Sequence, residues 1–349
     1  MDKIQIVSWL LTRRCNLRCE YCALVRNYKG KPDKYPDMKH YHQHEMSTEY
    51  ILEVLAKIKE HNPNAFHILY GGEPLLRKDL AQIVNFCNEN DIHYTIISNN
   101  SKEIMPMFED LMVEVDHING YTASVDPVIV MDPDKVDPHR LDKSLSGYAK
   151  LLALKNLYGK ELIKDPVAEI TVDNESVPYL HKLVSMLSEA GISSDITFVD
   201  IAKSPYYDFS NVFDESQLVE QSDELSIQFD KIIDDKLDVH MADKLLPAIW
   251  KILPADMDCG IEHNVHNMTI DADGTVRLCL RIRGLSTPMV KAIDAFGRGG
   301  KLNPFLKQQL KKDKVKYCRG CNWTCMLMSQ IITKQSHLYR DLVHTERRE

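Results

Sequence analysis

The chain up to residue 202 shows two hydrophobic periods in turn, one typical of strands and one typical of amphipathic helices. Short apolar runs rich in β-branched and aromatic residues predict strands at 4–11, 66–70, 93–98, 115–125, 167–172 and 195–201. Between these runs, apolar residues recur three and four positions apart and predict helices near 47–61, 77–90, 102–112, 144–158 and 176–190. Strands that alternate with helices of this length predict an α/β fold with a parallel sheet of βαβ units.

Six strand–helix units are too few to close an eight-stranded barrel, so this part of the chain predicts an open sheet. In such sheets, ligands bind at the carboxyl ends of the strands. From 203 to 258 the pattern becomes helical and acidic, which predicts a connector with scaffold helices. In the rest of the chain, NMTIDADGTVRLC at 267–279 predicts a β-hairpin, and the last residues predict an amphipathic helix. We therefore expect domains at 1–202, 203–258 and 259–349.

The composition is ordinary for a globular protein, because 44% of the 349 residues are hydrophobic and 27% are charged. A net charge of -8 argues against a nucleic-acid surface. No apolar run approaches the roughly 18 residues that span a bilayer, and the N-terminus lacks the basic-then-apolar order of a signal peptide. We expect a cytoplasmic protein without membrane contact, in which grouped cysteines are metal ligands rather than disulfides.

Eight of the nine cysteines fall into two groups, at 15–22 and 259–325. The first group, TRRCNLRCEYC, has the spacing CxxxCxxC and follows the first predicted strand. A structural zinc site is closed by four protein ligands, whereas three thiolates on a [4Fe–4S] cluster leave one iron open to a small molecule. A zinc loop or unrelated buried thiols are the alternatives. The ninth cysteine, Cys87, lies in a helical pattern and is predicted to be a core residue.

Three further predicted strands end in polar or glycine-rich motifs. YGGEP at 70–74 places two glycines where backbone can approach a ligand closely, and Glu73 adds an acceptor for a cation. A tight turn is the alternative there. SNNS at 98–101 supplies polar side chains at the next strand end, or else caps a helix. ASVDP at 123–127 adds a serine and an aspartate at the strand end that follows.

Together these motifs resemble those of the radical S-adenosylmethionine (SAM) enzymes. The resemblance rests on CxxxCxxC with Tyr21 before its third cysteine, on GGE at the next strand, and on strand ends similar to the family's NG-type and SLDG motifs. It implies a (β/α)6 partial TIM barrel. It also implies that Cys15, Cys19 and Cys22 hold a SAM-binding [4Fe–4S] cluster.

The resemblance further implies a set of SAM-binding residues. GGE would hold the amino group of SAM, SNNS would contact its ribose and carboxylate, and Ser124 and Asp126 would face the same cavity. Arg140 could pair with the carboxylate, with Lys143 as a competitor and a surface charge as the alternative for each. The cofactor-binding residues predicted in this way are Tyr21, Gly71, Gly72, Glu73, Ser98, Asn99, Ser124, Asp126 and Arg140. Asn100 departs from the family pattern, because it replaces the usual glycine.

The distal cysteines resemble the SPASM/twitch extension of the same superfamily. They are Cys259, Cys279, Cys318, Cys321 and Cys325, the last three in the pattern CxxCxxxC. A full SPASM domain holds two auxiliary clusters and needs more cysteines, so these imply the twitch version with one auxiliary [4Fe–4S] cluster. We expect Cys259, Cys279, Cys318 and Cys321 to be its ligands, with Cys325 able to replace one of the last pair. Zinc is the alternative metal.

The resemblance implies that the protein cleaves SAM reductively and that the resulting 5′-deoxyadenosyl radical removes a hydrogen atom from a substrate. The expected reaction is oxidative modification of a peptide, a protein or a small-molecule natural-product precursor, with flavodoxin or ferredoxin as electron donor. We expect Asp200, Tyr206, Tyr207 and Asp208, after the sixth strand, to face the substrate; loop residues without chemistry are the alternative. The competing hypothesis is a non-enzymatic iron–sulfur or zinc protein for electron transfer or interaction.

Overall fold

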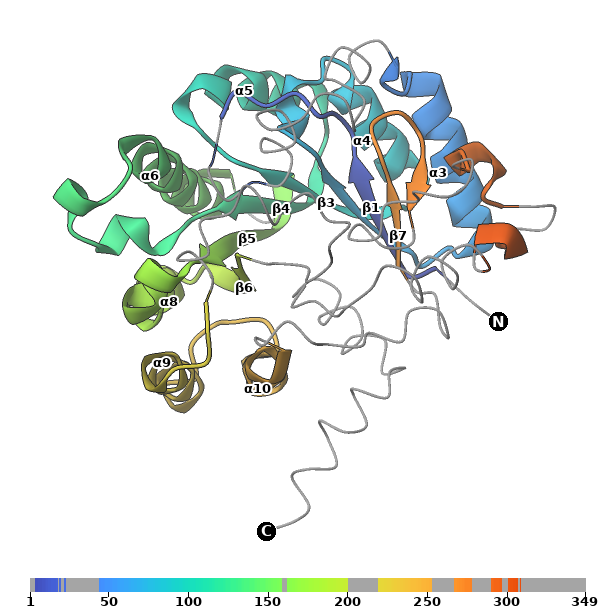
Figure 1. Ribbon diagram of the computed structural model, residues 1–349. Helices are drawn as coiled ribbons and strands as arrows, with labels where there is room; N and C mark the ends of the chain where they lie inside the picture. Colours follow the sequence, from blue (N-terminus) through green and yellow to red (C-terminus); the bar gives the residue numbers. More distant parts are fainter. Residues whose placement is uncertain are drawn as a thin grey trace, which may run out of the picture.

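A curved sheet of eight strands forms the centre of this protein, seen in a computed structural model (Figure 1). The structure describes residues 4–17, 19, 22, 44–158, 162–199, 219–252, 267–277, 290–296, 301–306 and 308. The strands are β1 (Ile6–Leu10), β2 (Phe66–Tyr70), β3 (His93–Ser98), β4 (Ile118–Ser124), β5 (Ile163–Val172), β6 (Ser193–Phe198), β7 (Asn267–Ile270) and β8 (Val276–Arg277). Their order is β6-β5-β4-β3-β2-β1-β7-β8. All neighbouring pairs are parallel except β7 and β8.

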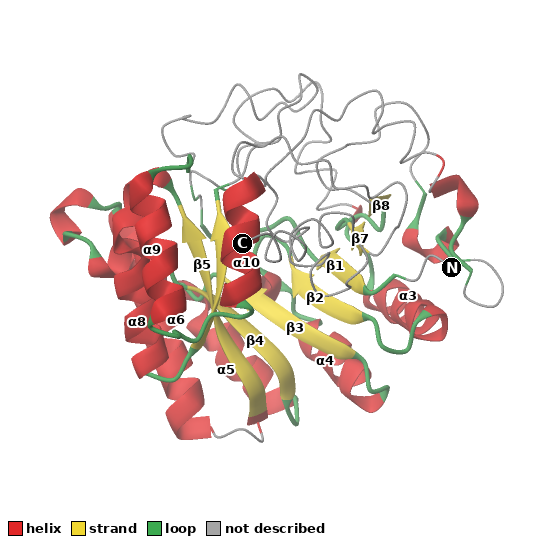
Figure 2. Cartoon of the chain, turned by 90° about the horizontal axis from the view of Figure 1, so that it is seen from below, coloured by secondary structure: helices red, strands yellow, loops and turns green. Residues whose placement is uncertain are grey.

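Helices flank the outer face of the barrel part of this sheet (Figure 2). They are α3 (Thr48–His61), α4 (Leu80–Glu89), α5 (Met105–Glu114), α6 (Pro138–Ala153) and α8 (Leu180–Glu189), and α9 (Asp223–Asp234) and α10 (Ala242–Ile252) follow β6. Shorter helical segments are η2 (Pro74–Leu76), η3 (Lys102–Ile104), η4 (Pro127–Val130), η5 (Pro133–Lys135), η6 (Leu154–Tyr158), η7 (Asn174–Tyr179) and η10 (Ala292–Asp294). The predicted α/β partial barrel is confirmed.

Helix α3 illustrates how local sequence forms these elements. The Ser47 hydroxyl accepts a hydrogen bond from the Tyr50 amide at 3.3 Å, which confirms the predicted start of the helix. One face of α3 is apolar and fully buried against the sheet; its residues are Ile51, Val54, Leu55 and Ile58. On α4, Cys87 is also fully buried, so its predicted place in the core is confirmed.

The hairpin predicted at 267–279 is present, but it contributes to the barrel sheet itself. Strands β7 and β8 are antiparallel around a turn at Gly274, whose φ of +79° suits glycine. Strand β7 also pairs in parallel with β1, from Ile6 opposite Asn267 to Trp9 opposite Ile270. The sequence pattern of a hairpin is local and does not indicate which distant edge it joins. This pairing brings the start of the C-terminal region beside the strand that precedes the first cysteines.

Between β6 and β7 the described residues include the two helices α9 and α10. Between α9 and α10 the chain also covers the free edge of β6. The Ser194 amide donates to Asp238 O at 2.9 Å, and the His240 amide donates to Ser194 O at 3.0 Å. Among the helices in the described ranges, none is long and apolar enough to cross a bilayer.

Candidate functional site

The hydrogen-bond ladder between β1 and β2 continues beyond both strands into the cysteine motif. The Leu11 amide donates to Tyr70 O at 2.8 Å, and further along the Glu73 amide donates to Arg14 O at 2.8 Å. The segment before Cys15 is therefore fixed to the GGE motif by backbone bonds. The carboxyl ends of two parallel strands supply both motifs, which is where sheets of this class bind ligands.

The two glycines of GGE permit this close approach. A Cβ atom on Gly71 would lie 2.3 Å from Thr12 O, and one on Gly72 would lie 2.1 Å from Arg14 O. Real Cβ atoms do not approach a backbone oxygen so closely, so any larger residue would force the two segments apart. The sequence pattern alone connects these glycines with a ligand. The structure shows that they also allow the cysteine segment itself to approach β2.

The cysteines of the first motif are partly buried and close enough for their charges to interact. The Cys15 sulfur accepts hydrogen bonds from the Leu17 amide at 3.4 Å and from Asn99 Nδ2 at 3.6 Å. The Cys22 amide donates to Cys19 O at 3.1 Å. Burial raises the pKa of Cys15 to about 12, and the nearby negative charges add to that effect. Without metal, Cys15 is thus a neutral thiol, and it must release its proton to become a ligand.

The arrangement of these thiols is compatible with an iron–sulfur cluster. Among the residues that the structure describes, no three or more His, Cys, Asp or Glu side chains form a group that could hold one metal ion. A four-iron cluster takes its three thiolates on separate irons, so the sulfurs need not converge on one point. N–H groups directed at a ligand sulfur, as at Cys15, are also a feature that stabilises such clusters.

Glu73 is fully buried, and its carboxylate joins the ends of β2 and β3. One oxygen accepts from the Leu75 amide at 3.1 Å and from Ser98 Oγ at 3.0 Å, and the other accepts from the Asn99 amide at 2.8 Å. Burial raises the pKa of Glu73 to about 7, although these three donors oppose the shift. The sequence predicts that this carboxylate accepts from the amino group of SAM. In this structure, donors of the protein itself surround it.

The β3 end connects Glu73 to the cysteines. While the Asn99 amide is bonded to Glu73, the Asn99 side chain donates to the Cys15 sulfur. Asn100 has a left-handed φ of 55°, a conformation that asparagine tolerates, which explains how it can replace a glycine. Its side chain accepts from the Tyr121 hydroxyl at 2.5 Å. Ser101 precedes η3 but makes no side-chain cap, so the alternative explanation of this motif finds no support there.

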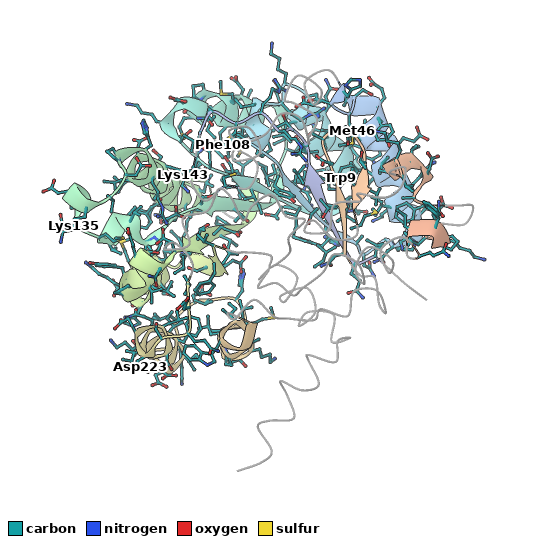
Figure 3. All side chains as sticks on the ribbon, in the orientation of Figure 1. Trp9, Met46, Phe108, Lys135, Lys143 and Asp223 are labelled. Atoms are coloured by element: carbon teal, nitrogen blue, oxygen red, sulfur yellow. The ribbon has the colours of Figure 1, made fainter. Side chains whose placement is uncertain are left out.

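At the β4 end, two cations share one buried carboxylate. Asp126 Oδ2 accepts from Arg140 Nε and from Lys143 Nζ, each at 3.0 Å, and Arg140 also contacts Asp173. These cations hold the pKa of Asp126 below its usual range, although burial opposes them. Both cations also lower the pKa of Cys19 against a larger upward shift from burial. Arg140 and Lys143, on α6, are therefore close enough to the cysteine motif to affect it electrostatically (Figure 3 labels Lys143).

Two further carboxylates on the inner face of the sheet were missed by sequence reasoning. Ser124, Glu169 and Asp195 are register partners on β4, β5 and β6, and each is partly exposed while its strand neighbours toward the helices are buried. Burial and the nearby Asp195 raise the pKa of Glu169 to about 8. The alternation in VAEITV and DITFVDI predicts the strands, but only the register shows that their carboxylates are adjacent.

The remaining predicted site residues lie outside the described part of the chain. They are Tyr21, Asp200, Tyr206, Tyr207, Asp208, Cys259, Cys279, Cys318, Cys321 and Cys325. The auxiliary site and the loop predicted to face the substrate therefore stay predictions. The structure brings together the ends of β1, β2 and β3 around Cys15, and it places Asp126 with Arg140 and Lys143 at the neighbouring strand end.

Comparison with known proteins agrees with this geometry. Residues 9–155 match the family model described as Radical SAM superfamily, and this segment runs from β1 to the end of α6. It includes Cys15, Cys19 and Cys22, the GGE motif and the Asp126 cluster. This segment, which is less than half of the chain, is therefore a radical SAM domain, and the proteins of that superfamily are enzymes.

Individual relatives are distant. An uncharacterized protein, MJ0907 of Methanocaldococcus jannaschii, is 28% identical over 200 residues, which cover 56% of this chain and 62% of that protein. The matched region thus spans less than two thirds of that relative. The structure of anSMEcpe with bound AdoMet and the Cp18Cys peptide has a TM-score of 0.55 at 13% identity, covering 98% of this chain and 99% of that one. SuiB of Streptococcus suis bound to the precursor peptide SuiA has a TM-score of 0.53 at 14% identity, covering 84% and 63%. At these identities the two structures confirm the fold alone.

Proposed function

We propose that this protein is a radical SAM enzyme that cleaves SAM reductively and removes a hydrogen atom from a substrate C–H bond. The observation that carries the proposal is the 2.8 Å bond between the Glu73 amide and Arg14 O, which fixes GGE beside the segment that leads into Cys15. A zinc loop or a simple electron carrier needs neither a three-cysteine motif nor a glycine-lined strand end beside it.

In the proposed enzyme, Cys15, Cys19 and Cys22 bind the [4Fe–4S] cluster, which supplies the electron for SAM cleavage when bound. The GGE segment holds the amino group of SAM through its backbone, because three protein donors already surround the Glu73 carboxylate. That carboxylate fixes the ends of β2 and β3 relative to each other. The Asn99 side chain stabilises the thiolate of Cys15 through its N–H group.

Arg140 and Lys143 are the proposed partners of the SAM carboxylate. A guanidinium matches a carboxylate with two parallel hydrogen bonds, whereas an ammonium acts as a point charge. Both cations now contact Asp126, so either one would share its hydrogen bonds between Asp126 and the ligand. Asp126 thereby keeps two cations in place beside the cysteine motif before the ligand binds.

We infer that the substrate is a peptide or a small natural-product precursor and that the reaction is oxidative. Two proteins with a similar fold were solved with peptides bound, which supports a peptide as the substrate of this protein. Glu169 and Asp195 line the inner face beside Ser124, where a substrate would have to approach the SAM site. Cys259, Cys279, Cys318 and Cys321, with Cys325 as a substitute, would bind an auxiliary cluster that accepts an electron from the substrate. A flavodoxin or ferredoxin would reduce the first cluster.

The test is SAM cleavage by anaerobically reconstituted, reduced protein. We expect 5′-deoxyadenosine and methionine from the wild type. The variant with Cys15, Cys19 and Cys22 replaced by alanine should form neither, while it retains the iron of the distal site. Cleavage by that variant would reject the proposal, and so would a wild type that contains zinc and no iron. Replacing the distal cysteines instead should leave SAM cleavage intact and abolish substrate turnover.

A further inference from the structure

The segment that carries the three cysteines is bonded near both of its ends to the same hairpin turn. We call residues 271–275, between β7 and β8, the Asp271 turn. On one side, Arg13 Nε donates to Asp271 Oδ1 at 2.8 Å and Arg13 Nη2 donates to Asp271 Oδ2 at 2.5 Å. On the other side, the Met46 amide donates to Ala272 O at 2.8 Å. Residues 13 and 46 flank all three cysteines in the sequence.

The contact with Arg13 is buried and geometrically specific. The side chain of Arg13 is 7% exposed and that of Asp271 is 1% exposed. Two parallel hydrogen bonds between a guanidinium and a carboxylate fix orientation as well as distance. Asp271 is itself held in the turn, because its Oδ1 accepts from the Ala272 amide at 2.8 Å and its carbonyl accepts from the Gly274 amide at 2.8 Å. The turn therefore presents a carboxylate with a fixed direction to Arg13.

Arg13 occupies a position from which its side chain can set the place of Cys15. Its neighbours in the chain both accept backbone bonds from the GGE motif, Thr12 from the Gly72 amide at 2.7 Å and Arg14 from the Glu73 amide at 2.8 Å. Cys15 follows directly. A displacement of Arg13 thus moves the backbone that aligns Cys15 with GGE.

We propose that Arg13 and Asp271 are positioning residues through which the C-terminal hairpin holds the cysteine segment in register with the GGE motif. The inference rests on the proposed function, because it concerns the cluster that the cysteines would bind. Cys259 and Cys279 lie on either side of this hairpin in the sequence. The Asp271 turn therefore links the hairpin between these two cysteines directly to the segment that carries the first three.

Other contacts close the base of the cysteine segment independently of this pair. Arg77 donates to Leu11 O at 2.8 Å and to Met46 O at 3.1 Å. Glu45 contacts Arg14, with Nη2 to Oε2 at 3.2 Å. Loss of the Asp271 contact alone should therefore leave the fold intact and change the alignment of Cys15. A conservative variant can separate positioning from folding for this reason.

The test uses Asp271→Asn and Arg13→Lys in the full chain. The first change keeps the shape of the side chain, which can still accept from the Ala272 amide, while the second keeps the charge and loses the two-pronged geometry. Lys291→Met is the matched control, because half-exposed Lys291 lies outside the hairpin and donates to Asp273 O of the same turn at 2.6 Å. In metal-free protein we expect at least about threefold faster hydrogen exchange at the amides of Gly72, Glu73 and Met46 in both variants, and no change in the control.

The second readout is the reduced, reconstituted protein. We expect the fraction of the electron paramagnetic resonance signal that changes on SAM addition to fall at least about threefold in both variants, with the distal signal unchanged. A merely structural role would lower the melting temperature and leave that fraction unchanged. Folded variants with wild-type exchange and a wild-type response to SAM would overturn this inference alone. A wild type whose signal does not respond to SAM would overturn the proposed function as well.

Discussion

At the carboxyl ends of the parallel strands, polar groups are held in one way at β1 to β3 and in another way at β4 to β6. At β1 to β3, backbone bonds, two glycines, neutral donors around Glu73 and one buried ion pair, Arg13 with Asp271, fix the cysteine segment. At β4 to β6, charged side chains contact each other, as Asp126 does with Arg140 and Lys143. A backbone contact cannot change its partner without moving a strand, whereas a side-chain cation can. The ends of β1 to β3 therefore suit a permanently bound cluster, and the ends of β4 to β6 suit a ligand that binds and leaves.

Removing the Asp126 carboxylate, which Arg140 and Lys143 share, should have the largest effect. Asp126→Leu takes away the acceptor that two cations share, one of them 3% exposed, and should cost about 3–5 kcal/mol of unfolding free energy. Urea unfolding of metal-free protein measures the loss. Asp132→Asn is the control, because Asp132 and Lys135 form a mostly exposed pair worth less than about 1 kcal/mol. If Asp126→Leu lowers the unfolding free energy by less than about 1 kcal/mol, Arg140 and Lys143 do not need this carboxylate as a partner.

The glycine contacts give the next largest effect. Gly72→Ala places a carbon against Arg14 O and should cost about 3 kcal/mol, as overpacking against rigid backbone does. It should also weaken SAM binding at least about tenfold. Gly120→Ala is the matched comparison, because its added carbon would lie 3.0 Å from the Thr95 side chain and 3.1 Å from Tyr94 O, a much milder approach than the 2.1 Å at Gly72. Equal losses at the two positions would contradict the special role of GGE.

Glu73→Gln should cost about 1–3 kcal/mol, because a glutamine amide directs N–H groups at donors that need an acceptor. Since the same change disturbs the strand ends, the stability loss and the weaker SAM binding should occur together. Thermal unfolding and titration with SAM measure the two effects. If SAM binding weakens while stability is unchanged, Glu73 contacts the amino group of SAM directly, as the sequence alone suggests.

The smallest effect concerns Glu169, whose pKa is raised to about 8. The folded state binds this proton more tightly than the unfolded state, whose carboxyl titrates near 4.3. Stability from this group is therefore complete at low pH and falls as pH rises toward 8. Glu169→Gln should remove that fall and raise the melting temperature at pH 8–9 by roughly 2 °C or more. Asp195→Asn should make the fall smaller and end it at lower pH, because ionised Glu169 would lose a repulsive neighbour and its pKa would drop.

The barrel could be predicted from the sequence because each of its strands and helices has a pattern within a short stretch of residues. The sequence predicts strand β2 at its observed bounds, and the helix it predicts near 47–61 is α3, with Ser47 as its N-cap. The contacts that join distant segments could not be predicted in this way. The pairing of β7 with β1 and the bond between Arg13 and Asp271 connect residues far apart in the chain. No spacing pattern reports such a contact.

In the candidate site, too, the features that are local in sequence could be predicted, and those formed by distant segments could not. The cysteine spacing and GGE indicate the proposed chemistry, since each motif lies within a few residues of sequence. The role of Glu73 was less accessible, because its three donors come from two different strand ends. Glu169 and Asp195 were missed for a related reason: their sequence pattern predicts strands, and only the register places one carboxylate beside the other.

In the proposed enzyme, Cys15, Cys19 and Cys22 hold a cluster with an iron open to SAM. Electron paramagnetic resonance of the reduced protein, recorded with and without SAM, tests it most directly. We predict a [4Fe–4S] signal that changes when SAM is added, in the wild type and equally in the variant without distal cysteines. A signal that SAM leaves unchanged, or a change that persists after Cys15, Cys19 and Cys22 are replaced by alanine, would contradict the claim.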